Sequence, residues 1–386
     1  MKKKIFLATT NRADYDHLIW LYKSLVNEKK FDVTFLITGS HFSKKFGNTL
    51  NQVRKDKIRK SIEIKIKISG DEVADISETF ADTIKKFSTI FRKNGPDLLI
   101  ILGDRFELLA LTISASLNKI PIAHVNGGES TQGAQDEWIR HSITKISNLH
   151  FVANKDYKKR VIQLGESPKT VFNVGGLSSD NIKKTKLYNK RELEKLLKVK
   201  FLNKKILVIY HPETLSFKTE KKSFQNILNT LGKIDNVQFF FSGPNIDQGN
   251  SKILKLIKIF QKKKKNSHFF YNLGRRKYLS LLKIVDLVVG NSSSGVLEAP
   301  YMKVYSINIG DRQKGRKMSP SVINIKNSSS IIRKKIIKYL YLKKNKNFFN
   351  KSNLFYGRGN TAENIVRILK NHNFKFDIKK EFYDLN

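Results

Sequence analysis

Acidic and histidine side chains recur where apolar runs of the chain end. They are Asp104, His124, Glu129, Asp136 and His211. If the runs are parallel strands, these side chains lie along the carboxyl edges of sheets, where ligands bind. Carboxylates held close together push their pKa values apart, so that one accepts a proton while another donates one. The pattern therefore indicates proton transfer, although Asp104 or Asp136 alone could equally be the N-cap of a helix.

A serine-rich turn offers a second kind of chemistry. It separates the apolar run 285–289 from a helical pattern and contains Ser292, Ser293, Ser294 and Gly295. Glycine lets the backbone approach a ligand, and the first amides of a helix attract anions. Glu298 would repel a phosphate, so a pair of ribose hydroxyls is its natural partner. The turn thus predicts a nucleotide diphosphate site, with a plain N-cap at Ser294 as the alternative.

Other chemistries find no support in the motifs. The chain has no cysteine, which removes disulfides, thiolate nucleophiles and thiolate metal sites. His124, Glu129 and His211 lack the helical spacing of metal ligands, so we expect no metal. Walker, Gly-x-Gly-x-x-Gly and Gly-x-Ser-x-Gly patterns are also missing at the required places, so we expect no ATP, no dinucleotide cofactor and no serine nucleophile.

The formal net charge of +41 raises the possibility of a nucleic-acid partner. Lysine is spread along the whole chain together with isoleucine and asparagine, which favours a bias of composition over a binding stripe. The runs 262–265 and 343–346 are the best candidates for a functional basic surface. We expect no specific nucleic-acid partner, although a positive field would attract an anionic substrate.

No part of the chain suggests insertion into a membrane. The apolar run that starts at Ile5 is too short for a signal peptide, and it ends in polar residues. No stretch approaches the roughly 20 apolar residues of a membrane span. We therefore expect a cytoplasmic protein with no membrane partner.

Apolar runs of strand length alternate with helical patterns along the chain. The expected strands are 4–9, 31–38, 96–102, 120–125, 205–210, 238–241, 268–271, 285–289 and 304–307. At 386 residues the chain exceeds a usual single core, so two domains are expected. The alternation predicts an α/β fold with two Rossmann-like, doubly wound domains that face a cleft. The expected parts are residues 1–176, residues 177–360, and a helix in 361–386 that packs back on the first domain.

Several longer stretches resemble one enzyme family. They are 103–107, 124–129, 136–145, 210–214, 242–247, 290–298 and 308–316. In this order they resemble the hydrolysing UDP-N-acetylglucosamine 2-epimerases of the sialic-acid and legionaminic-acid pathways. The matches span almost the whole chain. The serine turn and the Arg-His-Ser-Ile-Thr-Lys stretch at 140–145 are the most specific of them.

The resemblance implies a fold like that of GT-B glycosyltransferases and a UDP-sugar substrate. By similarity, the residues that contact the UDP-sugar are Arg12, Asn245, Ser292, Ser293, Ser294, Gly295, Glu298 and Arg312. The implied catalytic residues are Asp104, Glu129, Asp136 and His211. In the family, a base removes a proton from the carbon that carries the acetamido group, UDP leaves, and water adds to the glycal. That route uses no metal and no other cofactor, and the family suggests a homodimer.

The chain departs from the family pattern at Asn126, where relatives often carry Glu or His. An amide cannot replace an acid or base, so either Glu129 and Asp136 do the work or the substrate differs. The expected reaction releases UDP and N-acetylmannosamine from UDP-N-acetylglucosamine. The nearest alternative substrate is UDP-N,N'-diacetylbacillosamine. Alternatives of other kinds are a non-hydrolysing epimerase, a GT-B glycosyltransferase and a nucleic-acid-binding protein.

Overall fold

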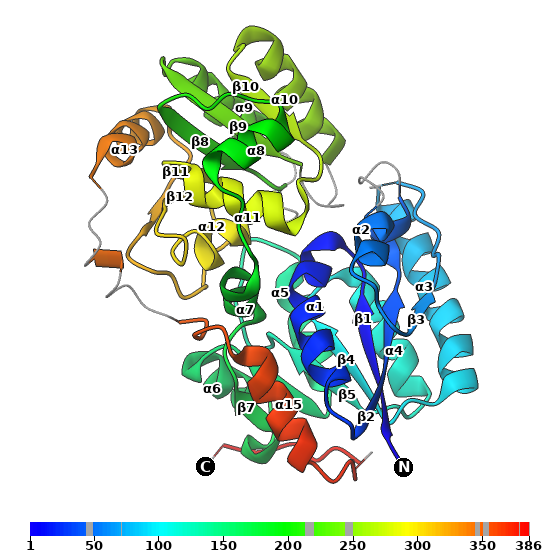
Figure 1. Cartoon of the computed structure of the whole chain (residues 1–386). Helices are drawn as coiled ribbons and strands as arrows, with labels where there is room; N and C mark the ends of the chain where they lie inside the picture. Colours follow the sequence, from blue (N-terminus) through cyan, green and yellow to red (C-terminus); the bar gives the residue numbers. More distant parts are fainter. Residues whose placement is uncertain are drawn as a thin grey trace. The chain divides into compact units, whose positions relative to one another are not determined.

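The computed structural model forms two compact units (Figure 1). It describes residues 1–43, 49–70, 72–212, 220–243, 250–343, 348–349, 355–377 and 379–385. Unit 1 comprises 1–129, 135–184 and 355–386, and unit 2 comprises 130–134 and 185–354. Each unit contains a parallel sheet of its own.

Unit 1 is built on a seven-stranded sheet of order β3-β2-β1-β4-β5-β6-β7, with every pair parallel. The strands are β1 (Lys3–Thr9), β2 (Phe31–Ile37), β3 (Ser61–Glu63), β4 (Leu98–Leu102), β5 (Ile122–Val125), β6 (Leu149–Val152) and β7 (Val171–Asn173). Every residue of β4 is buried, because helices cover both faces of the sheet. The strand order reverses between β1 and β4, and ligands of such sheets bind at the carboxyl ends near this point.

Helices cover both faces of the unit 1 sheet. They are α1 (Arg12–Val26), η1 (Gly39–Phe42), α2 (Leu50–Lys55), α3 (Val73–Asn94), α4 (Phe106–Leu117), α5 (Asp136–Ile146), α6 (Lys155–Gln163), η3 (Pro168–Thr170), α7 (Leu177–Lys184) and α15 (Thr361–Asn371). On one face, Leu21 of α1 and Ile365 of α15 share a core, and on the other Phe87 of α3 packs with Ile143 of α5. Figure 1 shows α15 beside α1 and α7, which it contacts although it follows unit 2 in the chain.

Unit 2 repeats the architecture with a six-stranded parallel sheet of order β10-β9-β8-β11-β12-β13. Its strands are β8 (Lys204–Ile209), β9 (Val237–Ser242), β10 (Ser267–Phe270), β11 (Leu287–Gly290), β12 (Tyr305–Ile309) and β13 (Val322–Ile325). Its helices are α8 (Lys190–Leu197), α9 (Glu220–Gly232), α10 (Asn250–Lys263), α11 (Gly274–Ile284), α12 (Ser293–Leu297) and α13 (Ser329–Tyr341). Phe224, Ile257 and Ile336, from α9, α10 and α13, pack in one core with the sheet. The strand order reverses between β8 and β11.

The predicted α/β class with two doubly wound sheets is confirmed. Four strands, β3, β6, β7 and β13, are absent from the expected set; each has only three or four residues, too few for a clear apolar run. The expected second part starts at residue 177, whereas α7 at 177–184 packs against α1 and belongs to unit 1. The contacts therefore divide the chain after Lys184, and they assign 130–134 to unit 2.

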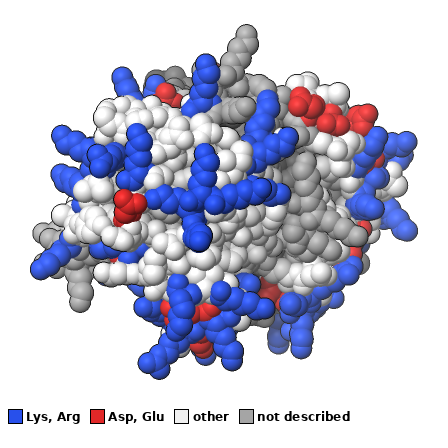
Figure 2. All heavy atoms as spheres, turned by 90° about the horizontal axis from the view of Figure 1, so that it is seen from above, with Lys and Arg blue, Asp and Glu red and all other residues white. Residues whose placement is uncertain are grey.

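Basic side chains are spread across the face seen in Figure 2, with acidic side chains in a few separate groups. Of the two lysine runs singled out in the sequence, 262–265 lies at the end of α10, where Lys264 pairs with Asp235 at 3.1 Å. Most of the other run, 343–346, lies outside the described residues. In the described part of the chain, no helix combines the length and apolar character needed to cross a bilayer.

Candidate functional site

A buried arginine joins two loops of unit 1. Arg140 lies on α5, and its side chain is 1% exposed. Its Nε donates to Asp104 Oδ2 at 2.8 Å, its Nη2 contacts the same carboxylate, and its Nη1 donates to the carbonyl of Glu129 at 2.9 Å. A guanidinium presents its donors in a fixed fork, so it orients a carboxylate as well as compensating its charge. Arg140 was part of the family resemblance, but the sequence analysis assigned it no role.

A neutral histidine supports the loop that carries Asp104. His124, on β5, is fully buried, and its Nε2 lies 2.8 Å from the carbonyl oxygen of Gly103. Burial lowers the pKa of His124 to about 3, so the ring is neutral near pH 7. Because only a protonated nitrogen can donate to a carbonyl, Nε2 carries the hydrogen. His124 therefore positions the residue before Asp104 and does not exchange protons at neutral pH.

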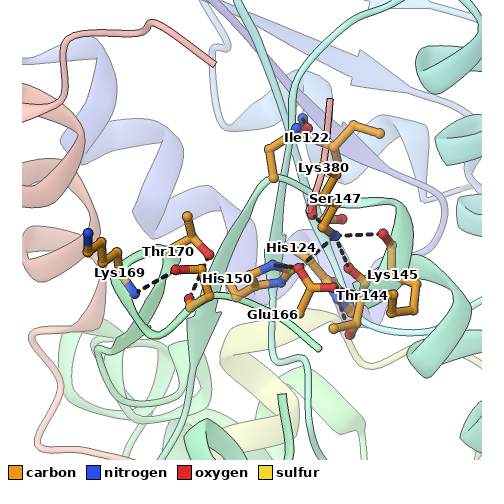
Figure 3. A network of polar contacts seen from close by, with 12 residues as sticks. Ile122, His124, Thr144, Lys145, Ser147, His150, Glu166, Lys169, Thr170 and Lys380 are labelled. Atoms are coloured by element: carbon orange, nitrogen blue, oxygen red, sulfur yellow. Dashed lines mark hydrogen bonds and ion pairs between the residues drawn. The ribbon is translucent and has the colours of Figure 1, made fainter. Parts of the chain in front are cut away.

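The opposite end of α5 is held by a buried cluster around Glu166 (Figure 3). Glu166 is 1% exposed and accepts hydrogen bonds from His150 Nε2 at 2.8 Å, Lys145 Nζ at 2.8 Å and Lys380 Nζ at 2.6 Å. Lys380 also donates to the carbonyls of Lys145 and Ser147, each at 2.6 Å. These carbonyls belong to the C-terminal end of α5, where a helix leaves acceptors without internal partners. The C-terminal segment of the chain thus stabilises the helix that carries Arg140.

The three predicted acids of unit 1 lie around Arg140. Asp104 contacts its guanidinium, Glu129 is 1% exposed and is bound through its carbonyl, and Asp136 begins the same helix about one turn earlier. An acid at a helix N-terminus is favoured by the positive end of the helix dipole. The loop before Glu129 needs a glycine at position 128. Its φ is +76°, and a Cβ atom there would lie 2.4 Å from the carbonyl oxygen of Tyr157 on α6. The structure therefore brings these acids into one region.

A further acid, Asp14, follows β1 at the same edge of the sheet. Its Oδ2 accepts hydrogen bonds from Thr10 Oγ1 at 2.9 Å and Asn11 Nδ2 at 2.8 Å. Burial raises the pKa of Asp14 to about 7, although the hydrogen bond from Thr10 and the charge of Arg105 act in the opposite direction. Asp14 follows the first strand in the sequence but was not among the predicted site residues.

The serine turn of unit 2 is ordered by contacts among its own side chains. Ser292 caps α12 and accepts a hydrogen bond from the amide of Ser294 at 3.3 Å. Ser294 Oγ donates to Glu298 Oε2 at 2.6 Å and contacts the hydroxyl of Tyr278. Ser294 was expected to face a diphosphate, whereas here its hydroxyl is bound to Glu298. The side chain of Ser293 makes no hydrogen bond among the described residues.

A buried asparagine links the serine turn to two other loops of unit 2. Asn291 Oδ1 accepts from the amide of His211 at 2.8 Å, and its Nδ2 donates to the carbonyl of His211 at 2.8 Å. The carbonyl of Asn291 accepts from Gln313 Nε2 at 3.0 Å and Arg312 Nη1 at 3.4 Å. His211 and Arg312, both predicted from the family resemblance, are therefore held beside the serine turn. Asn291 itself was missed, because its role depends on contacts between loops that are far apart in the sequence.

Two further residues were predicted from the family resemblance. Arg12 is in unit 1, where it pairs with Asp16 at 3.1 Å on the first turns of α1. Asn245 lies outside the described residues. Among the residues that are described, no group of three His, Asp or Glu side chains could hold a metal ion.

The fold and the loops at its strand ends define a class, that of enzymes with two GT-B-like Rossmann units. The solved structure of UDP-GlcNAc 2-epimerase from Neisseria meningitidis bound to UDP-GlcNAc matches the chain with a TM-score of 0.78. It is 17% identical and covers 96% of this chain and 100% of that one. A family model described as UDP-N-acetylglucosamine 2-epimerase matches residues 23–370. The chain belongs to this family, and the prediction of a UDP-sugar 2-epimerase enzyme is confirmed at that level.

Two relatives are similar to the chain over most of its length. GDP/UDP-N,N'-diacetylbacillosamine 2-epimerase (hydrolyzing) of Campylobacter jejuni is 40% identical over 84% of this chain and 84% of the relative. Polysialic acid biosynthesis protein P7 of Escherichia coli is 35% identical over 99% of this chain and 98% of the relative. The second of these relatives matches almost the whole chain, so that similarity extends through both units.

Proposed function

We propose that the chain is a hydrolysing 2-epimerase that converts UDP-N-acetylglucosamine into N-acetylmannosamine and UDP. The observation that carries the proposal is the fork of Arg140, which orients the carboxylate of Asp104 and holds the backbone of Glu129. A carbon next to the anomeric centre is a weak acid, so its proton is removed only by a well-positioned base. A buried guanidinium supplies that positioning without taking up a proton itself.

The proposed reaction has two halves. In the first, a carboxylate of the set Asp104, Glu129 and Asp136 takes the proton from the carbon bearing the acetamido group, and the bond from the anomeric carbon to UDP breaks. In the second, water adds its oxygen to the anomeric carbon of the glycal, and the neighbouring carbon receives a proton on the opposite face. The products are UDP and the 2-epimeric sugar, and all atoms of the added water are retained.

UDP binding is assigned to unit 2. We propose that Ser292 and Ser293 bind the diphosphate through their hydroxyls, and that Gly295 keeps the turn free of a side chain beside it, because hydroxyl groups can donate to phosphate oxygens. Glu298 is assigned to the ribose hydroxyls, with its carboxylate oriented by Ser294. Asn245 and Arg312 complete the proposed set in unit 2, with Asn245 assigned by family resemblance alone. His211, which the resemblance includes among the catalytic residues, is held beside the serine turn by Asn291.

The second candidate substrate is UDP-N,N'-diacetylbacillosamine. The specific observation that favours it is the 40% identity to the Campylobacter jejuni relative, whose name includes this sugar. The two candidates share the UDP group, the acetamido carbon and the proposed chemistry. They differ at the carbons farther from the diphosphate.

Turnover in deuterated water tests the proposal. Purified protein is incubated separately with each UDP-sugar, and the products are followed by NMR. We expect free 2-epimeric sugar carrying deuterium at the acetamido carbon, together with UDP in equal amount. Epimerised sugar still attached to UDP would contradict hydrolysis, and no turnover of either sugar would contradict the proposal as a whole. The ratio of the two rates identifies the preferred sugar.

A further inference from the structure

Asn126 occupies the end of β5, next to the loop that carries Asp104. The amide of Gly103 donates to the carbonyl of Val125 at 3.1 Å, and the amide of Asn126 donates to the carbonyl of Phe151 at 2.9 Å. These bonds continue the ladder between β4, β5 and β6 by one step beyond the strands. Asn126 is therefore fixed between the carboxyl ends of two neighbouring strands, in the region of the proposed acids.

The backbone of Asn126 adopts an unusual conformation. Its φ of +68° lies in the left-handed region, which costs energy for any residue with a Cβ atom. Among such residues, asparagine is one of those that adopt this conformation most readily. The two residues that follow are Gly127 and Gly128. A side chain at Gly127 would lie 3.1 Å from His124 Nδ1, so the loop has little room to relax. The backbone of Asn126 is thus held in this conformation by the packing of the loop that follows.

The side-chain amide of Asn126 has an oxygen that accepts no hydrogen bond from the described residues. Its Oδ1 is buried, and among the described residues it has no hydrogen-bond partner. A buried polar oxygen without a partner is unfavourable, so such atoms in native proteins usually serve a ligand or an ordered water. The atom needs a donor, and neither a phosphate nor an ionised carboxylate can supply one.

We propose that Asn126 Oδ1 accepts a hydrogen bond from the acetamido N–H of the sugar, which makes Asn126 a substrate-binding residue that helps to select 2-acetamido sugars. This inference rests on the proposed function. In that reaction, Asp104 and Glu129 act at the carbon that carries the acetamido group, and Asn126 is fixed beside the loop of Asp104. The acetamido N–H is the donor attached to that carbon in both candidate sugars. An amide side chain does not titrate, so it can bind the substituent without competing for the proton that the acids transfer.

Replacement of Asn126 by glycine is the most informative test. Glycine adopts the left-handed backbone conformation at no steric cost, and the substitution removes only the side-chain amide. Asn236→Gly is the matched control, because Asn236 also has a positive φ, of +58°, but is exposed in a loop of unit 2. Each variant is compared with the wild-type protein in kcat/KM for the UDP-sugar that is turned over. The inhibition constants of UDP and of UDP-glucose, which lacks the acetamido group, are measured in parallel.

We expect Asn126→Gly to lower kcat/KM by about 10-fold, the usual effect of one lost hydrogen bond, and to leave inhibition by UDP unchanged. Inhibition by UDP-glucose should weaken much less than kcat/KM falls. Asn236→Gly should alter none of these quantities. Unchanged kcat/KM in Asn126→Gly would overturn the inference. So would an equal weakening for the UDP-sugar substrate, UDP and UDP-glucose. Either result would leave the proposed function standing. If the wild-type chain turns over neither UDP-sugar, the proposed function fails and the inference fails with it.

Discussion

Arg140 and Asp104 form an ion pair in which the side chain of Arg140 is 1% exposed and that of Asp104 is 21% exposed. The pair connects the N-terminal half of α5 to the loop after β4, so the geometry of one acid depends on a residue that follows it by 36 positions. Breaking a buried pair by removing one partner leaves an uncompensated charge, which typically costs about 3–5 kcal/mol.

We expect Arg140→Lys to reduce turnover by at least about 100-fold while the protein remains folded. Lysine keeps the positive charge but cannot bind Asp104 and the carbonyl of Glu129 at the same time. The rate is measured with the preferred UDP-sugar, and circular dichroism checks the fold. Arg92→Lys, an exposed change on α3, is the control. A normal rate in Arg140→Lys would show that the fork is not required.

Asp104→Asn and Glu129→Gln should each lower turnover by at least about 100-fold, the usual contribution of an acid or base. UDP should still bind with wild-type affinity, because the proposed UDP site belongs to unit 2. Steady-state rates and calorimetric titration with UDP make the comparison. Near-normal rates in both variants would remove these two acids from the mechanism.

Ser293→Ala should weaken the binding of UDP by roughly 10-fold, since a neutral hydrogen bond to a ligand is typically worth about 1 kcal/mol. Ser293 is the informative choice because Ser294 already donates to Glu298. Ser330→Ala, on the exposed start of α13, is the control. An identical titration curve for Ser293→Ala and the control would count against the role of this hydroxyl.

Glu166→Gln should destabilise the protein, with the largest effect near neutral pH. Burial on its own raises the pKa of Glu166, but hydrogen bonds and charges from His150, Lys145 and Lys380 outweigh it, so the pKa lies below the ordinary 4.5. A depressed pKa contributes stability that is fully present above the unfolded value and is lost as the pH falls through the folded value. The difference in Tm between wild type and variant should therefore shrink below about pH 4.5. Lys379→Ala, an exposed neighbour of Lys380, provides the control.

Asp14→Asn should change stability in the opposite sense with pH. The pKa of Asp14 is raised from 3.8 to about 7 by burial, so folding favours its protonated form. A raised pKa contributes stability that is complete below the unfolded value and is lost as the pH rises through the folded value. Relative to the wild type, Asp14→Asn should therefore gain Tm between pH 4 and pH 8. A constant difference in Tm over this range would contradict the raised pKa.

The strands and the serine turn were accessible from the sequence because their signals are local. Buried strands such as β4 are continuous apolar runs, and the turn at Ser292 combines a strand end, small residues and a helix start within a few positions. The acids Asp104, Glu129 and Asp136 could be selected because each stands near a strand end. Their mutual arrangement was not accessible, because it depends on Arg140 contacting two separate loops.

The local pattern of apolar and polar residues by itself determined the α/β class, the positions of the main strands and the kinds of side chain at their carboxyl ends. Tertiary structure alone decided that Lys380 binds Glu166, that Asn291 binds the loop of His211, and that the side-chain oxygen of Asn126 is buried with no partner among the described residues. The physical reason is that hydrophobic periodicity acts over neighbouring residues. Hydrogen bonds and ion pairs between distant loops form only when the packed sheets bring those loops together.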